Sequence, residues 1–182
     1  APTAGACGVL PAVLVPYFQK RCKDTDKILK AMYVAAGIGQ IIATRSSISG
    51  AAGGCQAEIG AASSMAAGAL VYLQGGDCTQ IANAAAMAMK NLLGLVCDPV
   101  AGLVEVPCVK RNVIGTVNAM SAADMAMAGI TSRIPPDQVM DAMKEVGDKM
   151  DASLRETALG GLAHTEEGMK IAEKMYSSHK NC

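Results

Sequence analysis

Aromatic residues and net charge are what this sequence most clearly lacks. Its 182 residues include one phenylalanine, four tyrosines and no tryptophan, which argues against a stacking platform for single-stranded nucleic acid. Sixteen basic and sixteen acidic residues cancel, so no basic surface is indicated for nucleic acid or an anionic membrane. We therefore expect neither nucleic acid nor a membrane as a partner.

Strand signals are also scarce. Alternating runs of β-branched residues are nearly absent, whereas Ala, Met, Leu, Lys and Glu fill long windows at helical spacing. Most of the apolar residues are small or unbranched, and a core of that kind implies close contact between helices. We predict an all-α fold, a single compact domain of Ala-rich packed helices over residues 1–182 with cysteine-bearing loops.

Capping residues, prolines and glycines divide the chain into seven expected helices. Asp24 and Asp77 are suitable N-caps, and Pro11 and Pro136 suit first turns. The expected helices cover residues 8–22, 25–44, 56–73, 78–94, 110–128, 136–149 and 165–176. The glycine-rich stretch 45–54 and the proline-containing stretch 97–108 are predicted to be loops, residues 156–163 a turn and 177–182 a polar tail.

Neither a leader sequence nor a membrane span is expected. The first nineteen residues are uncharged but lack a basic start and contain three prolines. The uncharged run 59–76 is about as long as a membrane span, yet its Gly, Ser and Gln content favours a buried helix. We therefore expect a cytoplasmic protein.

Seven cysteines need an explanation other than disulfides, because the cytoplasm keeps thiols reduced. No Cys-x-x-Cys pair is present, which argues against structural zinc and against a ferredoxin-type electron carrier. By spacing alone, small buried thiols are the favoured interpretation, with a metal or cluster site for a subset as the alternative. The cysteines are Cys7, Cys22, Cys55, Cys78, Cys97, Cys108 and Cys182.

Two loops place three of these cysteines in a setting that suits a reactive site. Cys55 precedes a predicted helix, whose dipole and free N–H groups favour a thiolate, and Gly53 and Gly54 allow the backbone to approach an inorganic group closely. Cys97 and Cys108 lie on the second loop. Three thiolates could converge on one centre with an open coordination position, which is typical of a catalytic metal.

The other candidate residues give weaker signals. Lys110 and Arg111 begin a predicted helix, where the dipole disfavours cations; a solvated surface is the favoured interpretation and a specific anionic partner the alternative. His164 and His179 are expected to be solvated. The serines and free N–H groups of the 45–54 loop suit a carboxylate or phosphate, but no nucleotide-binding motif accompanies them.

Four longer motifs carry a resemblance to a known family. They are "APTAGACGVLPAVL" (1–14), "SISGAAGGCQAEIG" (47–60), "MKNLLGLVCDPVAGLVEVPCVKRN" (89–112) and "LRETALGGLA" (154–163). Together they resemble the iron–sulfur-dependent L-serine dehydratases, specifically the α chain of the two-chain form. The resemblance covers residues 1–163, and its double-cysteine motif is long and specific.

The resemblance implies that Cys55, Cys97 and Cys108 are the protein ligands of a [4Fe-4S] cluster. The fourth iron would then polarise the hydroxyl of L-serine as a Lewis acid, and loss of a Cα proton and of hydroxide would lead to pyruvate and ammonia. No pyridoxal phosphate would be needed. A related lyase acting on L-threonine or L-cysteine, a non-lyase iron–sulfur protein (electron carrier or sensor), and a metal-free interaction module are the alternatives.

Substrate contacts and partners are implied by the same resemblance. Cys182 would be a fourth iron ligand when substrate is absent. A β chain and an oligomeric assembly are the expected partners besides L-serine, and no general base is assigned, because the family's α region continues upstream of this chain and the β chain adds further groups. The expected substrate-binding residues are Thr3, Gly5, Ala6, Ser47, Ser49 and Gly50.

Overall fold

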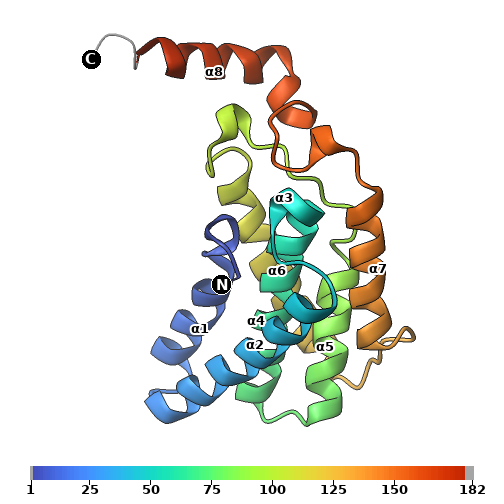
Figure 1. Cartoon of the computed structure of the whole chain (residues 1–182). Coiled ribbons are helices and arrows are strands. Elements are labelled where there is room, and N and C mark those ends of the chain that lie inside the picture. Colours follow the sequence, from blue (N-terminus) through green and yellow to red (C-terminus); the bar gives the residue numbers. More distant parts are fainter. Residues whose placement is uncertain (1, 179–182) are drawn as a thin grey trace.

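Helices make up the regular structure of this chain, for which a computed structural model describes residues 2–178 (Figure 1). In this range the sole β-type feature is a single bridge between Cys97 and Arg155, so the all-α prediction is confirmed. The α-helices are α1 (Val9–Lys20), α2 (Thr25–Arg45), α3 (Gly50–Gly53), α4 (Ala61–Gln74), α5 (Cys78–Lys90), α6 (Cys108–Met127), α7 (Pro136–Lys149) and α8 (Glu166–Ser178). Short helical turns are η1 (Ala4–Ala6), η2 (Gln56–Gly60), η3 (Val100–Gly102), η4 (Ala152–Leu154) and η5 (Gly161–His164).

Helix α4 forms the centre of the bundle and packs against α1, α2, α5 and α6. Twelve of its fourteen residues are buried, and most are Ala, Gly or Ser, so neighbouring helices approach its backbone closely. At Gly68, an added Cβ would lie 2.2 Å from Ile38 Cδ1 of α2. The uncharged run 59–76, expected to be a buried helix, contributes the end of η2 and all of α4, so the expected buried helix is confirmed as Ala61–Gln74.

The hydroxyl groups of two α4 serines form hydrogen bonds inside this core of small residues. Ser63 Oγ donates to the carbonyl of Gly115 on α6 at 2.8 Å, and Ser64 Oγ donates to the carbonyl of Ala85 on α5 at 2.9 Å. Buried polar groups normally need such partners. Within residues 2–178, no helix combines the length and apolar character needed to cross a membrane.

The predicted helix starts at Asp24 and Asp77 are confirmed. Asp24 Oδ1 accepts a hydrogen bond from Lys27 N at 3.1 Å. Asp77 and Gln80 form a reciprocal capping box, in which each side chain accepts from the other's backbone N–H, at 2.8 and 3.0 Å. The range of α7 coincides with the predicted one, because Pro136 fixes its start.

Other predicted boundaries were wrong around the cysteine loops. The 45–54 loop contains one helical turn, α3, and the predicted helix at 56–73 begins as the π-type turn η2 before α4. Helix α5 ends at Lys90, because the turn that follows carries Gly94 at φ 85°. Helix α6 begins at Cys108, since Pro107 can occupy its N-cap without losing a helical hydrogen bond.

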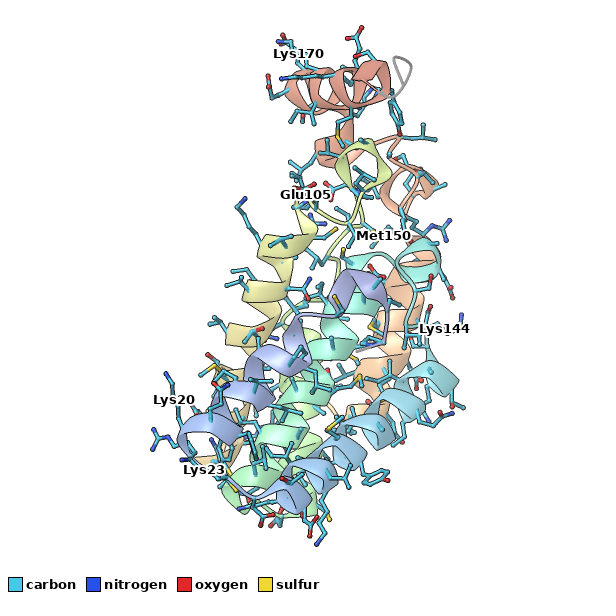
Figure 2. The ribbon with its side chains drawn as sticks, turned by 90° about the vertical axis from the view of Figure 1, so that its left-hand side faces the viewer. Lys20, Lys23, Glu105, Lys144, Met150 and Lys170 are labelled. Carbon is cyan, nitrogen blue, oxygen red and sulfur yellow. The ribbon has the colours of Figure 1, made fainter. Side chains whose placement is uncertain are left out.

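One end of the bundle gathers η1, α3, η2, the loop before α6 and the segment after α7. In Figure 2, Glu105 and Met150 lie toward this end, whereas Lys20 and Lys23 lie at the opposite end. Met150 packs over Gly54, where an added Cβ would lie 2.7 Å from its Sδ atom. Helix α8 extends across the same end in Figure 1 and contacts η3.

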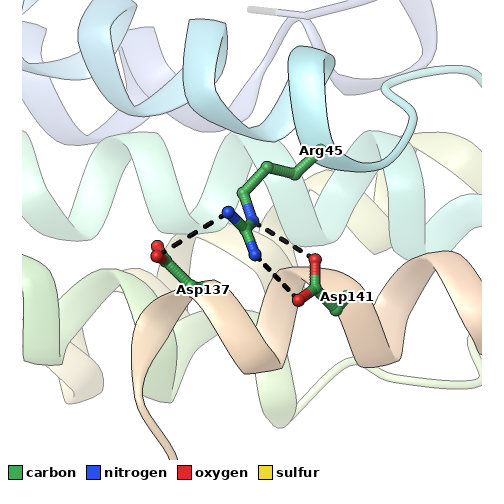
Figure 3. Close-up of polar contacts among 3 residues, drawn as sticks. All are labelled: Arg45, Asp137 and Asp141. Carbon is green, nitrogen blue, oxygen red and sulfur yellow. Dashed lines mark hydrogen bonds and ion pairs between the residues drawn. The ribbon is translucent and has the colours of Figure 1, made fainter.

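An ion-pair clamp joins α2 to α7 on the outside of the bundle (Figure 3). Arg45 Nη2 lies 2.8 Å from Asp141 Oδ2, and its Nε donates to Asp141 Oδ1 at 3.2 Å. Asp137 Oδ2 is 3.7 Å from Arg45 Nη1. All three side chains are exposed to water, so this clamp contributes little to stability.

Candidate metal centre

Three buried side chains at the loop-rich end place potential metal donors together. The Sγ atoms of Cys55 and Cys97 and a carboxylate oxygen of Glu58 all lie within 4.8 Å of one another. Cys55 occupies the N-cap of η2, Glu58 lies within that turn, and Cys97 comes from the loop before η3. This group can hold a metal ion or a metal-containing cofactor.

The position of Cys55 follows from the backbone on both sides of it. Gly54 adopts φ 75° and ψ 179°, a conformation that favours glycine, and it ends α3 just before Cys55. On the other side, Gln56 N donates to Leu95 O at 2.9 Å, and Gln56 Oε1 accepts from Gly94 N at 2.9 Å. Gln56 therefore joins the Cys55 turn to the segment that leads to Cys97.

Cys97 is held by the fourth of the family-like motifs, residues 154–163. Its N–H donates to Leu154 O at 2.8 Å, and its carbonyl accepts from Glu156 N at 2.7 Å. Glu156 and Ala158 adopt φ of 64° and 56°, values that non-glycine residues take uncommonly. The 154–163 motif therefore has a structural task beside the site.

Two glycines leave space around the donor group. A Cβ on Gly50 would lie 2.9 Å from Glu58 Oε2 and 3.0 Å from Cys97 Sγ, and a Cβ on Gly5 would lie 2.7 Å from the same Glu58 oxygen. Thr3 completes this side of the site, because its hydroxyl donates to Glu58 Oε1 at 2.5 Å. Thr3, Gly5 and Gly50, all expected at a substrate site, thus lie around the Glu58 carboxylate.

Cys108 lies beside this group without being a member of it. It is the first residue of α6 and is buried. Burial raises the pKa of its thiol, and the negative charge of Cys55 raises it further. The structure therefore brings Cys55 and Cys97 together and leaves Cys108 within electrostatic reach of them.

The pKa values of the neighbouring thiols Cys55 and Cys97 are shifted in opposite directions. The hydrogen bond from Cys97 lowers the pKa of Cys55, and the nearby Arg111 charge acts in the same direction against the effect of burial. The pKa of Cys97 is raised strongly, first by that same hydrogen bond and then by burial. Of the two thiols, Cys55 therefore loses its proton more readily, and the thiolate is the form that binds metals.

Glu58 is the principal site residue that the sequence reasoning did not single out. It is buried, and burial raises the pKa of its carboxyl, with the charge of Glu156 acting in the same direction. Its position three residues after Cys55 on a helical turn was the available signal, since such residues share a face.

Arg111 and Asp98 form a buried ion pair at the edge of the site. Arg111 Nη1 lies 2.8 Å from Asp98 Oδ1, with 16% of the arginine and 4% of the aspartate side chain exposed. Burial lowers the pKa of Arg111, but the charges of Cys55 and Asp98 outweigh this and leave it above its ordinary value. The favoured sequence-based interpretation, a solvated surface, therefore holds for Lys110 and is wrong for Arg111, whose charge is paired inside the protein.

The remaining predicted residues lie farther from the donor group. Ala6 is fully buried in the main apolar core. Ser47 lines a separate cavity of about 230 Å³ between the 45–54 segment and α7, and its Oγ accepts from Ser49 N at 3.1 Å. Cys182 lies outside the described residues. Of the cysteines that are described, all six are free thiols, and Cys7 and Cys78 are exposed.

Comparison with known proteins gives consistent matches. A family profile described as the serine dehydratase alpha chain matches residues 1–163. A probable L-serine dehydratase alpha chain of Bacillus subtilis is 54% identical over 96% of this chain and 58% of its own length. The L-serine dehydratase alpha chain of Peptoniphilus asaccharolyticus is 50% identical over 94% of this chain and 59% of its own length.

Longer relatives match over the same region. The L-serine dehydratase TdcG of Escherichia coli is 48% identical over 90% of this chain, which corresponds to 36% of its own length. The chain therefore spans between about a third and three fifths of these three relatives.

Proposed function

This chain belongs to the serine dehydratase alpha chain family, and we propose that it supplies the cluster-binding part of an iron–sulfur-dependent L-serine dehydratase. The reaction would be that of a carbon–nitrogen lyase, which converts L-serine to pyruvate and ammonia. The observation that carries the proposal is the buried Cys55–Glu58–Cys97 donor group, which lies inside two of the family-like motifs. L-Threonine and L-cysteine are alternative substrates of the same chemistry.

The residues present suit a sulfur-ligated iron group. Cys55, Cys97 and Cys108 are buried, unbridged thiols, and thiolates are the ligands that iron–sulfur clusters prefer. Gly5 and Gly50 carry no side chain that would displace Glu58 or Cys97 from the donor group. We therefore assign these three cysteines as ligands of a [4Fe-4S] cluster, which when bound would supply a Lewis acid for the substrate hydroxyl.

The chain's own residues would position the substrate. Thr3 orients the Glu58 carboxylate through a 2.5 Å hydrogen bond, and Gly5 and Gly50 border that carboxylate. We place the substrate on this side. Ala6, Ser47 and Ser49 would act through the backbone that carries Gly5 and Gly50, and Cys182 remains a proposed alternative ligand for the open iron.

A β chain and an oligomeric assembly complete the proposal. The first relative is named as an alpha chain, and a β chain would contribute further groups to the active site. The general base that removes the Cα proton is accordingly sought outside this chain.

A closed, substrate-insensitive cluster of an electron carrier or sensor is the second candidate. The observation that favours it is the position of the Glu58 carboxylate within the donor group, because Glu58 together with three cysteines would give four protein ligands. A four-ligand cluster has no open position for a substrate hydroxyl.

The ligand assignment is tested by Cys97→Ala, with Cys78→Ala as the matched control at an exposed cysteine. After anaerobic reconstitution with iron and sulfide, we expect Cys97→Ala to lose the broad visible absorption and the pyruvate formation seen with the partner chain. Cys78→Ala should keep both. Full absorption and full turnover in Cys97→Ala would show that the assignment is wrong.

A further inference from the structure

Arg111 directs one guanidinium nitrogen at three acceptors around Cys55. Its Nη1 donates to Val96 O at 2.8 Å and to Cys55 Sγ at 3.6 Å. The same nitrogen lies 2.8 Å from Asp98 Oδ1. Arg111 therefore links Cys55 of the first cysteine loop to Val96 and Asp98, the two sequence neighbours of Cys97 in the second loop.

Asp98 fixes the guanidinium in this position. Its Oδ2 accepts from Leu162 N at 2.8 Å, so the carboxylate is itself anchored to η5. Asp98 Oδ1 is buried and has no hydrogen-bond partner. The positive charge of Arg111, 2.8 Å away, offsets the cost of burying this oxygen. At Gly161, which has φ 60°, an added Cβ would lie 2.4 Å from Asp98 Oδ2, so the approach of η5 requires glycine.

The neighbouring cation provides a contrast on the same helix turn. Lys110 is exposed to water, whereas the Arg111 side chain is 16% exposed. Both lie in the first turn of α6, where the helix dipole disfavours positive charge. At Arg111 the fold provides a buried carboxylate, Asp98, and a sulfur acceptor, Cys55 Sγ, that offset this cost.

We propose that Arg111 is a positioning residue that holds Cys55 as a cluster ligand and stabilises negative charge on the cluster, with Asp98 and Leu162 N fixing its guanidinium. Donors to ligand sulfur and nearby charge both set the potential of iron–sulfur centres. This inference rests on the proposed function, because it requires that the chain binds the cluster.

The test compares Arg111→Gln, Arg111→Lys and the control Lys110→Gln in the anaerobically reconstituted protein. Two quantities are measured, the rate of iron loss to a chelator and the midpoint potential for one-electron reduction, followed by EPR. Circular dichroism and a thermal melt of each variant show whether it folds as the wild type does.

We expect Arg111→Gln to lose iron about 10-fold faster or more and to have a more negative midpoint potential, since it lacks the charge that favours the reduced cluster. Arg111→Lys should restore part of the potential because it keeps the charge. Lys110→Gln should match the wild type in both measurements, because its charge lies in solvent.

An unchanged potential in Arg111→Gln, or an equal shift in Lys110→Gln, would overturn the inference. If Arg111→Gln does not fold, the potential of Arg111→Lys decides: a wild-type value with wild-type iron loss would reject a specific guanidinium role. A wild-type protein that takes up no iron and sulfide would reject the proposed function instead, so the two failures are distinguishable.

Discussion

Two arginines in this chain are each held by aspartate, yet they sit in opposite environments. Arg45 bridges α2 to Asp137 and Asp141 of α7 on the outer surface, with 37% of its side chain exposed (Figure 3). Arg111 pairs with Asp98, of which 4% is exposed, and also contacts Cys55. Water can replace the partners of the first arginine but not those of the second, so only the second constrains a site.

The substitution expected to distinguish the two ion pairs most strongly, by its effect on stability, is Asp98→Ala. It removes the charge that compensates Arg111 and leaves Leu162 N without its acceptor. We expect the free energy of unfolding of the metal-free protein to fall by about 3 kcal/mol, the lower part of the range for breaking a buried pair, because Arg111 keeps some exposure. Urea unfolding followed by circular dichroism measures the change.

Asp141→Asn is the matched control for this prediction at the exposed pair, and Asp98→Asn keeps an acceptor for Leu162 N while removing the charge. Equal losses in Asp98→Ala and Asp141→Asn would contradict the distinction between the two arginines.

Gly50→Ala tests the packing at the buried end. The added Cβ would meet Glu58 Oε2 at 2.9 Å and Cys97 Sγ at 3.0 Å, so overpacking should cost about 1–3 kcal/mol of unfolding free energy. The displaced donors should also lower the iron and sulfide content after reconstitution. A variant that loads iron and sulfide as the wild type does, with unchanged stability, would show that Gly50 is not needed for space.

Gly37→Ala is the corresponding change on the exposed face of α2. Nothing lies within 4 Å of the added Cβ, and alanine favours a helix interior, so we expect a gain of about 0.5–1 kcal/mol in unfolding free energy. Iron loading should not change. A loss of stability in the same urea titration would indicate a contact that the fold described here does not contain.

Arg45→Gln should have the smallest effect. The pair is exposed, so the unfolding midpoint should change by no more than the error of the measurement. Any difference from wild type should disappear at high salt, because added ions screen surface charges. A large loss of stability that persists at high salt would contradict the distinction, because the exposed Arg45 pair would then stabilise the fold as the buried Arg111 pair does.

Local signals in the sequence predicted the scaffold well. Asp24, Asp77 and Pro136 mark helix starts through interactions within three or four residues, and these starts are confirmed. The all-α fold follows from composition and helical spacing in the same local way.

The geometry of the candidate site could not be predicted in this way, because it depends on contacts between residues far apart in the sequence. Cys97 pairs with Arg155 across 58 positions, and Asp98 accepts from Leu162 N across 64. The role of Arg111 was left open in the sequence because its partners, Asp98 and Cys55, come from other loops. Cysteine spacing alone favoured buried thiols over metal ligands. In the structure Cys55 and Cys97 are buried, and their Sγ atoms also lie close together in space.

The most direct test of the central claim is the Mössbauer spectrum of the ⁵⁷Fe-reconstituted, anaerobic protein with its partner chain, recorded with and without L-serine. We expect a four-iron cluster in which the signal of one iron changes when L-serine is added, because three cysteine ligands would leave that iron open. A complete cluster whose spectrum is identical with and without L-serine would contradict it and would favour a closed, four-ligand site.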